Sequence, residues 1–296
     1  MAGVDVFRWE ARPTGLREPV LIASFKGWND AGDAASFATS YLASAFDAKR
    51  FASVDPEGFF DFQSHRPRIS VTGGVVDGPI TLPSIELAYA TPAEGRSIVI
   101  LAGSEPSLRW PTLCRAALDI AVDLGVRDVV TLGALIADVP HTRPVRLTHM
   151  SVPERMTEQL SGRRPDYEGP TGIIAMLHAY AAERGLNAAS LWAAVPHYIG
   201  SAPAPNATLA LLQALTTVTG RTVDTSDLQT AVAAFEVEID EAVRNSPQAS
   251  GMLAELERTF DSESDQDLDV PSGDMIAAEF ERFLRDRADN EGTDAG

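Results

Sequence analysis

Side chains that could bind a ligand or transfer a proton follow four short apolar segments of the sequence. A histidine, which exchanges protons readily near neutral pH, follows two of the segments, and a glutamate that could act with it as an acid–base pair follows another. We therefore expect a single cleft that collects the residues after all four segments. The predicted cleft residues are Gly27, Trp28, Asn29, Asp30, Glu105, His141, Arg143, His197 and Tyr198.

The glycine-rich loop after the first segment resembles a phosphate-binding loop in its spacing but not in its chemistry. Gly27 and Gly32 match the two glycines of a P-loop, yet Asp33 and Ala34 stand where that loop needs lysine and then serine or threonine. Acidic side chains here would repel an anion. We therefore interpret Asn29 or Asp30 as the cap of a following helix.

The sequence lacks the usual signs of a catalytic centre. It has no Gly-x-Ser-x-Gly motif, and its one cysteine, Cys114, falls in the middle of a predicted helix, where a small core residue is expected. Its histidines are scattered, and the acidic run at residues 265–269 lacks the glycine and the final glutamate of a calcium loop. We predict no catalytic residue, metal or cofactor. Each of the two Val-Pro-His tripeptides then serves to end a strand.

Hydrophobic patterning predicts the elements that position these residues. Short apolar runs rich in β-branched residues predict buried parallel strands at Val20 to Phe25, Ile98 to Ala102, Val129 to Ile136 and Leu191 to Val195. Helical patterns occupy residues 30–46, 111–124, 171–184 and 206–219. This alternation predicts a three-layer α/β/α fold with a mostly parallel sheet. Ligands of such sheets bind beyond the carboxyl ends of the strands, where the candidate residues lie.

Net charge excludes some partners. The 296 residues carry a formal charge of −18, and residues 221–296 hold 20 acidic against 6 basic side chains. Phosphate-rich partners such as nucleic acid or an anionic membrane would be repelled there. No apolar run approaches the length of a membrane span, and the N-terminus has no basic region followed by an apolar one, so we expect a cytoplasmic protein.

The pattern changes to helices alone after Gly220. We therefore predict an α/β/α domain at residues 1–220, an acidic helical extension at 221–290 and a disordered tail at 291–296. An acidic linker at residues 261–269 is expected to be mobile. The apolar stripes of the extension should pack on the domain through four buried side chains, Phe235, Ile239, Phe280 and Phe283.

Six short motifs occur in order over residues 18–220. They are Gly27-Trp28-Asn29-Asp30-Ala31-Gly32, Arg66-Pro67, Gly103-Ser104-Glu105-Pro106, Pro140-His141-Thr142-Arg143-Pro144, Tyr167-x-Gly169-Pro170-x-Gly172 and Pro196-His197-Tyr198. In this set the chain resembles the prokaryotic branch of the proteasome assembly chaperone 2 family. The resemblance implies a purine nucleoside phosphorylase-like fold, a homo-oligomer such as a trimer, and a role in holding or assembling proteasome subunits. Relatives that dock on proteasome rings do so through a C-terminal hydrophobic-Tyr-x tail, which Asp294-Ala295-Gly296 does not match.

Two functions of different classes follow. The first is a non-catalytic, oligomeric, chaperone-like protein that binds a protein partner, with a proteasome component as the candidate that the resemblance implies. The alternative is a small-molecule hydrolase or phosphorylase-like enzyme that uses Glu105, His141 and His197 at the strand ends.

Overall fold

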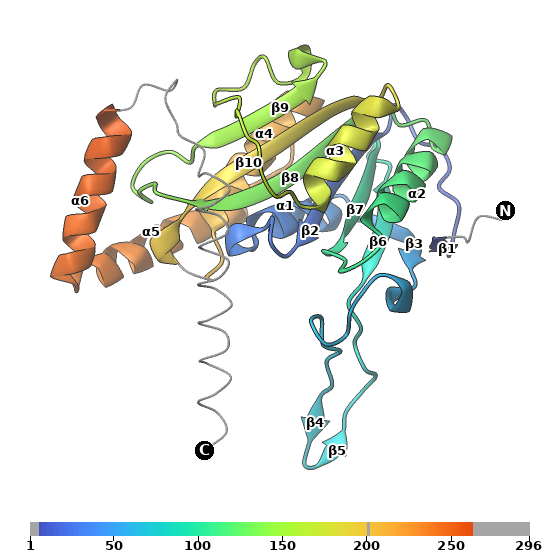
Figure 1. Ribbon diagram of the computed structural model, residues 1–296, viewed down its shortest axis with the longest axis horizontal. Helices are drawn as coiled ribbons and strands as arrows, with labels where there is room; N and C mark the ends of the chain where they lie inside the picture. Colours follow the sequence, from blue (N-terminus) through green and yellow to red (C-terminus); the bar gives the residue numbers. More distant parts are fainter. Residues whose placement is uncertain (1–5, 200–201, 263–296) are drawn as a thin grey trace.

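An eight-stranded sheet forms the centre of the computed structural model, which describes residues 6–199 and 202–262 (Figure 1). Its strand order is β1-β3-β6-β7-β2-β8-β10-β9. The strands are β1 (Phe7–Trp9), β2 (Val20–Lys26), β3 (Lys49–Val54), β6 (Ile85–Ala90), β7 (Ile98–Ser104), β8 (Asp128–Ala137), β9 (Leu147–Val152) and β10 (Asn187–Pro196).

The four strands predicted from the sequence lie side by side in the middle of this sheet. Strands β7, β2, β8 and β10 are parallel to one another, as the apolar runs predict. The outer strands β1, β3, β6 and β9 pair antiparallel and make the sheet mixed. All four central strands therefore end at one edge, which we call the carboxyl edge.

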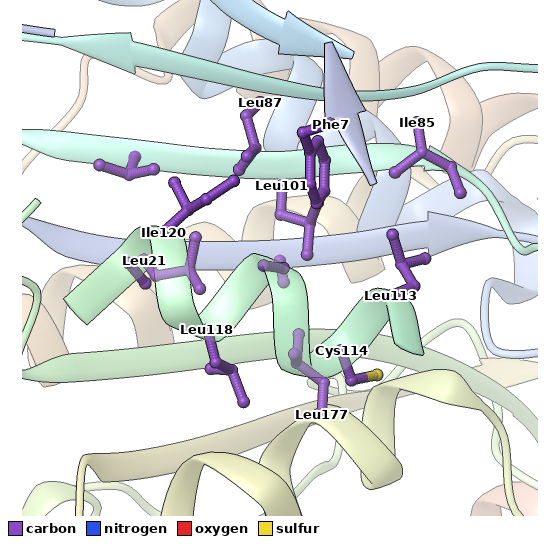
Figure 2. Packing of buried hydrophobic residues seen from close by; sticks show 14 of the residues in the cluster. Phe7, Leu21, Ile85, Leu87, Leu101, Leu113, Cys114, Leu118, Ile120 and Leu177 are labelled. Carbon is purple, nitrogen blue, oxygen red and sulfur yellow. The ribbon is translucent and has the colours of Figure 1, made fainter. Parts of the chain in front are cut away.

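Helices cover both faces of the sheet and confirm the three-layer α/β/α prediction. Helices α2 (Trp110–Asp123) and α3 (Ile173–Glu183) pack on one face, and Figure 2 shows Leu113, Leu118 and Leu177 among the side chains of this layer. Cys114 is buried in the same cluster, as predicted. Helices α1 (Ala34–Ala45) and α4 (Pro205–Thr219) pack on the opposite face. Three-residue 3₁₀ turns lie at Ala31–Asp33, Pro56–Gly58, Glu154–Met156 and His197–Ile199.

Two acidic helices follow the α/β/α layers, α5 (Ser226–Arg244) and α6 (Pro247–Ser262). In α5 only Leu228 and Val243 are buried. The prediction that Phe235 and Ile239 are buried is wrong, because both remain partly exposed. Asp261 belongs to α6 rather than to a linker. The predicted burial of Phe280 and Phe283 and the rest of the linker, residues 263–269, lie outside the described residues.

A long β-hairpin, residues 66–84, leaves the body between β3 and β6 and was not predicted. We call it the arm. Figure 1 shows it projecting far from the sheet, with the two-residue strands β4 (Val71–Thr72) and β5 (Val75–Val76) at its tip. Backbone bonds in both directions between Arg68 and Thr81 tie its two halves together. No helix in the described part of the chain is long and apolar enough to cross a membrane.

Candidate functional site

The carboxyl edge carries the predicted cleft residues in the order of the strands. Glu105 follows β7, Asn29 follows β2, His141 follows β8 and His197 follows β10. The sheet therefore places all four positions along one edge, but their direct contacts fall into two groups. We call these the Glu105 cluster and the His141 cluster.

The Glu105 cluster joins three segments that are far apart in the sequence. Asn29 Nδ2 donates to Glu105 Oε1 over 2.8 Å, and the backbone N–H of Ile173, the first residue of α3, donates to the same oxygen over 3.1 Å. Asn29 is buried, and Gly172 passes so close that a Cβ there would lie 2.2 Å from Asn29 Nδ2. Only a glycine fits between this amide and the start of α3.

Gly27 and Asp30 complete this part of the edge. Gly27 has a φ of +150°, and a Cβ there would lie 3.1 Å from Glu105 Cβ. Asp30 Oδ1 accepts hydrogen bonds from the backbone N–H groups of Ala35 and Ser36 over 2.7 and 3.1 Å. These donors belong to the first turn of α1, so Asp30 accepts hydrogen bonds from backbone N–H groups that have no partner within the helix, as the capping interpretation predicts. Trp28, by contrast, is 39% exposed.

Burial shifts the pKa of both carboxyl groups in the same direction. Desolvation raises the pKa of Glu105 above its ordinary value, although the hydrogen bonds from Ile173, Trp28 and Asn29 act in the opposite direction. Desolvation likewise raises the pKa of Asp30, against the hydrogen bonds from the start of α1. An acidic group that is stabilised by helix N–H donors and enclosed by protein is typical of a structural carboxylate.

The His141 cluster connects the carboxyl edge to α5. The His141 side chain is only 1% exposed, with Nδ1 lying 2.8 Å from the Tyr198 hydroxyl and Nε2 lying 3.1 Å from Asp240 Oδ1. The Tyr198 hydroxyl also accepts from the backbone N–H of His141 over 2.7 Å. A neutral imidazole satisfies every contact if Tyr198 donates to Nδ1 and Nε2–H donates to Asp240. Burial raises the pKa of Tyr198 to about 12, so its hydroxyl keeps the proton needed for this arrangement.

Arg143 holds α6 in the same region. Its Nη1 lies 3.2 Å from Glu257 Oε1 and its Nη2 lies 2.7 Å from Asp261 Oδ2. The Arg143 guanidinium lowers the pKa of Asp261 through a direct hydrogen bond. The neighbouring Arg146 stacks on Phe260, with its guanidinium carbon 3.7 Å from the ring centroid. The loop after β8 therefore attaches both acidic helices to the body.

His197 has a contact of its own. Its Nδ1 lies 3.0 Å from Asp138 Oδ1, beyond the ends of β10 and β8. The His197 and Tyr198 rings meet edge to face, with centroids 5.5 Å apart. His197 is thus a neighbour of the His141 cluster, whereas no hydrogen bond in the described part of the chain joins Glu105 to either histidine.

Sequence reasoning missed the acidic residues that complete the His141 cluster. Asp240 is 99 positions from His141, and Glu257 and Asp261 are 114 and 118 positions from Arg143. All three belong to helices whose acidic faces resemble solvated surface. Ile239 and Val243 are four residues apart and therefore indicate which face of α5 turns toward the body. Asp240 follows Ile239 at the margin of that face, and this is the signal from which Asp240 could have been identified.

A cavity of about 660 Å³ opens beside the His141 cluster. It lies between α4, α5 and the loop after β8. Of the nine predicted cleft residues, His141 and Arg143 line it, together with Asp240 and Glu236 of α5 and Asn206 and Gln213 of α4. Within residues 6–199 and 202–262, no group of three or more His, Cys, Asp or Glu side chains has the arrangement of a metal site.

Solved structures share this architecture. The Mycobacterium tuberculosis proteasome-assembly chaperone homologue Rv2125 is 37% identical with a TM-score of 0.74, over 80% of this chain and 99% of that one. A PAC2 family protein from Streptomyces avermitilis is 39% identical with a TM-score of 0.71, over 79% and 99%. The Mycobacterium tuberculosis protein of unknown function Rv2714 is 28% identical with a TM-score of 0.82, over 88% and 92%. The search of curated proteins found no match.

A family model gives the same relationship from the sequence. The model described as the PAC2 family matches residues 24–243, a range that includes both clusters of the carboxyl edge and most of α5. This match confirms the resemblance that the six motifs predict. The chain belongs to the PAC2 family.

Proposed function

We propose that this chain is a non-catalytic, homo-oligomeric, chaperone-like protein of the cytoplasm, with a protein partner linked to proteasome assembly. Family membership supports the protein-binding role, and the similarity to a structure described as a proteasome-assembly chaperone homologue supports the kind of partner. The oligomer proposed from the family resemblance is a trimer. Residues 221–290 act in this proposal as an acidic extension of the α/β/α domain.

One observation carries the non-catalytic part of the proposal. Two of the groups at the carboxyl edge that could transfer a proton, Glu105 and His141, are engaged by other groups of the chain. Glu105 Oε1 accepts two hydrogen bonds, from Asn29 and from the start of α3. Both ring nitrogens of His141 lie within hydrogen-bonding distance of protein oxygens, so neither is directed at a free ligand.

Affinity capture tests the partner. The full chain would be tagged at its chromosomal locus, captured at its endogenous level and analysed by quantitative mass spectrometry. We expect proteasome subunits to be enriched at least tenfold over a capture with an unrelated tagged protein of similar acidity. Charge-driven adsorption is controlled by that comparison. Equal recovery of proteasome subunits with both baits would contradict the proposed partner.

A small-molecule hydrolase or phosphorylase-like enzyme is the second candidate, and the cavity beside His141 and Asp240 is the observation that favours it. Broad esterase, phosphatase and nucleosidase screens separate the two functions. Our proposal expects no turnover above buffer. Turnover by the wild type that is lost in a folded His141→Ala, His197→Ala double variant, with an unchanged melting profile, would favour the enzyme instead.

A further inference from the structure

A serine and a histidine that belong to neither cluster meet beside the root of the arm. Ser107 follows β7 at the carboxyl edge, two residues after Glu105, and His65 is the last residue before the arm. The Ser107 Oγ atom lies 3.1 Å from His65 Nδ1. Both residues are partly exposed to solvent. A serine hydroxyl that is hydrogen-bonded to an imidazole is the pairing that makes serine a nucleophile.

The hydrogen bonds of Ser107 direct its proton toward the imidazole. The backbone N–H of Asp61 donates to Ser107 Oγ over 3.1 Å and occupies one lone pair of that oxygen. The Ser107 proton remains available to His65 Nδ1, which accepts it when the imidazole is neutral and carries its own proton on Nε2. In this tautomer His65 is placed to act as the general base for Ser107.

Backbone hydrogen bonds hold the serine and its base in place. The N–H of His65 donates to Asp61 O over 2.8 Å and closes a turn at residues 61–65. The N–H of Leu108 donates to Phe59 O over 3.0 Å. These bonds tie the segment before the arm to the segment after β7. The pair is therefore built from two segments that are fixed to each other.

Two neighbouring groups stabilise the charges that form when the serine proton moves. Burial raises the pKa of Glu105, but the positive charge of His65 acts in the opposite direction, so these two groups attract one another. The same attraction stabilises an imidazolium at His65. Helix α2 begins at Trp110, three residues after Ser107, and the amino end of a helix attracts negative charge.

The surroundings of Ser107 fit an apolar acyl group. The next residue, Leu108, is 52% exposed, and the Phe60 ring lies 5.4 Å from the His65 ring between centroids. A serine with an adjacent base attacks an electrophilic carbonyl carbon and forms a covalent intermediate. An activated ester offers such a carbon together with a leaving group that is stable as an anion.

We infer that Ser107 is a covalent modification site that accepts an acyl group from an activated ester, with His65 as its base. Ser107 Oγ forms a bond to the carbonyl carbon, and the bond from that carbon to the leaving oxygen breaks. The serine proton passes through His65 Nδ1 to the leaving group, which departs as an alcohol or phenol. The inference goes beyond the proposed function, because one modification of each chain requires no turnover.

Acetylation by p-nitrophenyl acetate tests the site. The full chain would be incubated with this ester at pH 8, and mass spectrometry of its peptides would follow the acetylation of each serine with time. We expect Ser107 to react about tenfold or more faster than Ser64. Ser64 is the matched control, because it is exposed in the same segment but its hydroxyl donates to Asp61 Oδ2.

A conservative variant and the pH profile separate a base from a structural contact. Glutamine can still hydrogen-bond to Ser107 but cannot take its proton, so His65→Gln should slow the acetylation of Ser107 about tenfold or more and leave the melting profile unchanged. The wild-type rate should level off at alkaline pH once the imidazole is neutral. The rate of His65→Gln should keep rising with the hydroxide concentration.

Each outcome decides the inference or the proposed function. Acetylation of Ser107 no faster than that of Ser64 would overturn the inference, as would equal rates and equal pH profiles in His65→Gln and the wild type. Release of one equivalent of p-nitrophenol for each chain would support both the site and the non-catalytic function. Continued release that is lost in Ser107→Ala would support the site and overturn the non-catalytic function.

Discussion

Replacing Asn29 with aspartate tests the Glu105 cluster with a change of one atom. The wild-type amide nitrogen donates to Glu105 Oε1 over 2.8 Å in a buried site. In Asn29→Asp an oxygen replaces this donor, so two carboxyl groups face one another without water between them. They can remain together only if they share a proton or move apart.

The distance sets the size of the effect. Two unit charges separated by about 2.8 Å repel by about 6 kcal/mol at an effective dielectric constant of about 20. Protonating one carboxyl with an ordinary pKa near 4 costs about 4 kcal/mol at pH 7, since each pH unit contributes about 1.4 kcal/mol. Protonation is the cheaper response, so the free energy of unfolding should fall by about 4 kcal/mol at pH 7. Asn29→Ala, which only loses the hydrogen bond, should lose about 1.5–3 kcal/mol.

The two variants differ most in their dependence on pH. A carboxyl whose pKa is raised in the folded state stabilises the fold below its unfolded pKa, and this stabilisation is lost as the pH rises through the folded value. The wild type already has this trend, because burial raises the pKa of Glu105 and of Asp30. Asn29→Asp should add to it about 1.4 kcal/mol per pH unit between about pH 5 and 7. Asn29→Ala removes a hydrogen bond that lowers the pKa of Glu105 but adds no second carboxyl group, so it should add a smaller slope.

Urea unfolding followed by tryptophan fluorescence at pH 5 and pH 7 measures these values at one protein concentration. Asn187→Asp is the matched control, because Asn187 Nδ2 also lies 2.6 Å from a carboxylate, Asp128 Oδ1. There Arg96 lies 2.6 Å from the other carboxylate oxygen and compensates the added charge. The control should therefore lose less than Asn29→Asp. If Asn29→Asp and Asn29→Ala had equal stability at pH 7 and equal pH slopes, the buried contact with Glu105 would be refuted.

Three further predictions concern other parts of the fold. Gly172→Ala places a Cβ within 2.6 Å of the buried Asn29 amide and should lower the free energy of unfolding in urea by about 1–3 kcal/mol. The control Gly251→Ala, in open space on α6, should not lower it, and equal losses in the two variants would contradict the packing at Gly172. Arg143→Gln removes the exposed ion pair with Asp261 and should raise the rate of proteolytic cleavage of α6 severalfold at low salt. This increase should shrink at about 1 M NaCl, because salt screens the ion pair of the wild type, and a salt-independent increase would indicate that Arg143 acts other than through its charge. Burial raises the pKa of the Cys114 thiol to about 12, so a disulfide reagent at pH 8 should label this residue only after the protein unfolds. Rapid labelling of the folded protein would contradict the burial of Cys114.

The sequence predicts the centre of the fold better than its margins. Strands β2 and β8 are buried on both faces and are therefore continuous apolar runs, which the patterning identifies. Strand β3 begins with two exposed residues, and the burial of β6 is only partial at several positions. Such strands are stabilised by pairing partners distant in sequence rather than by their own composition, so local patterning does not detect them.

The candidate site divides in the same way. The sequence predicts that Asn29 and Glu105 lie on one edge of the sheet, because each follows a parallel strand and parallel strands end at the same edge. The acidic partner of His141 was not predictable by this argument, since Asp240 comes from a helix outside the sheet. Phe235 and Ile239 were expected to be buried because they form an apolar stripe, but only Leu228 and Val243 of α5 are buried, and the periodicity alone does not say how closely a helix packs on its neighbours.

The position of β2 has a consequence during synthesis on the ribosome. Both of its partners come later in the chain, since β7 is complete only at Ser104 and β8 only at Ala137. At a translation rate of about 5–20 residues per second, β2 waits roughly 4–16 s for its first neighbour and longer for its second. During that interval a strand with six consecutive buried-type residues has two unpaired edges. The nascent chain therefore presents an aggregation-prone segment before either partner strand of β2 is complete.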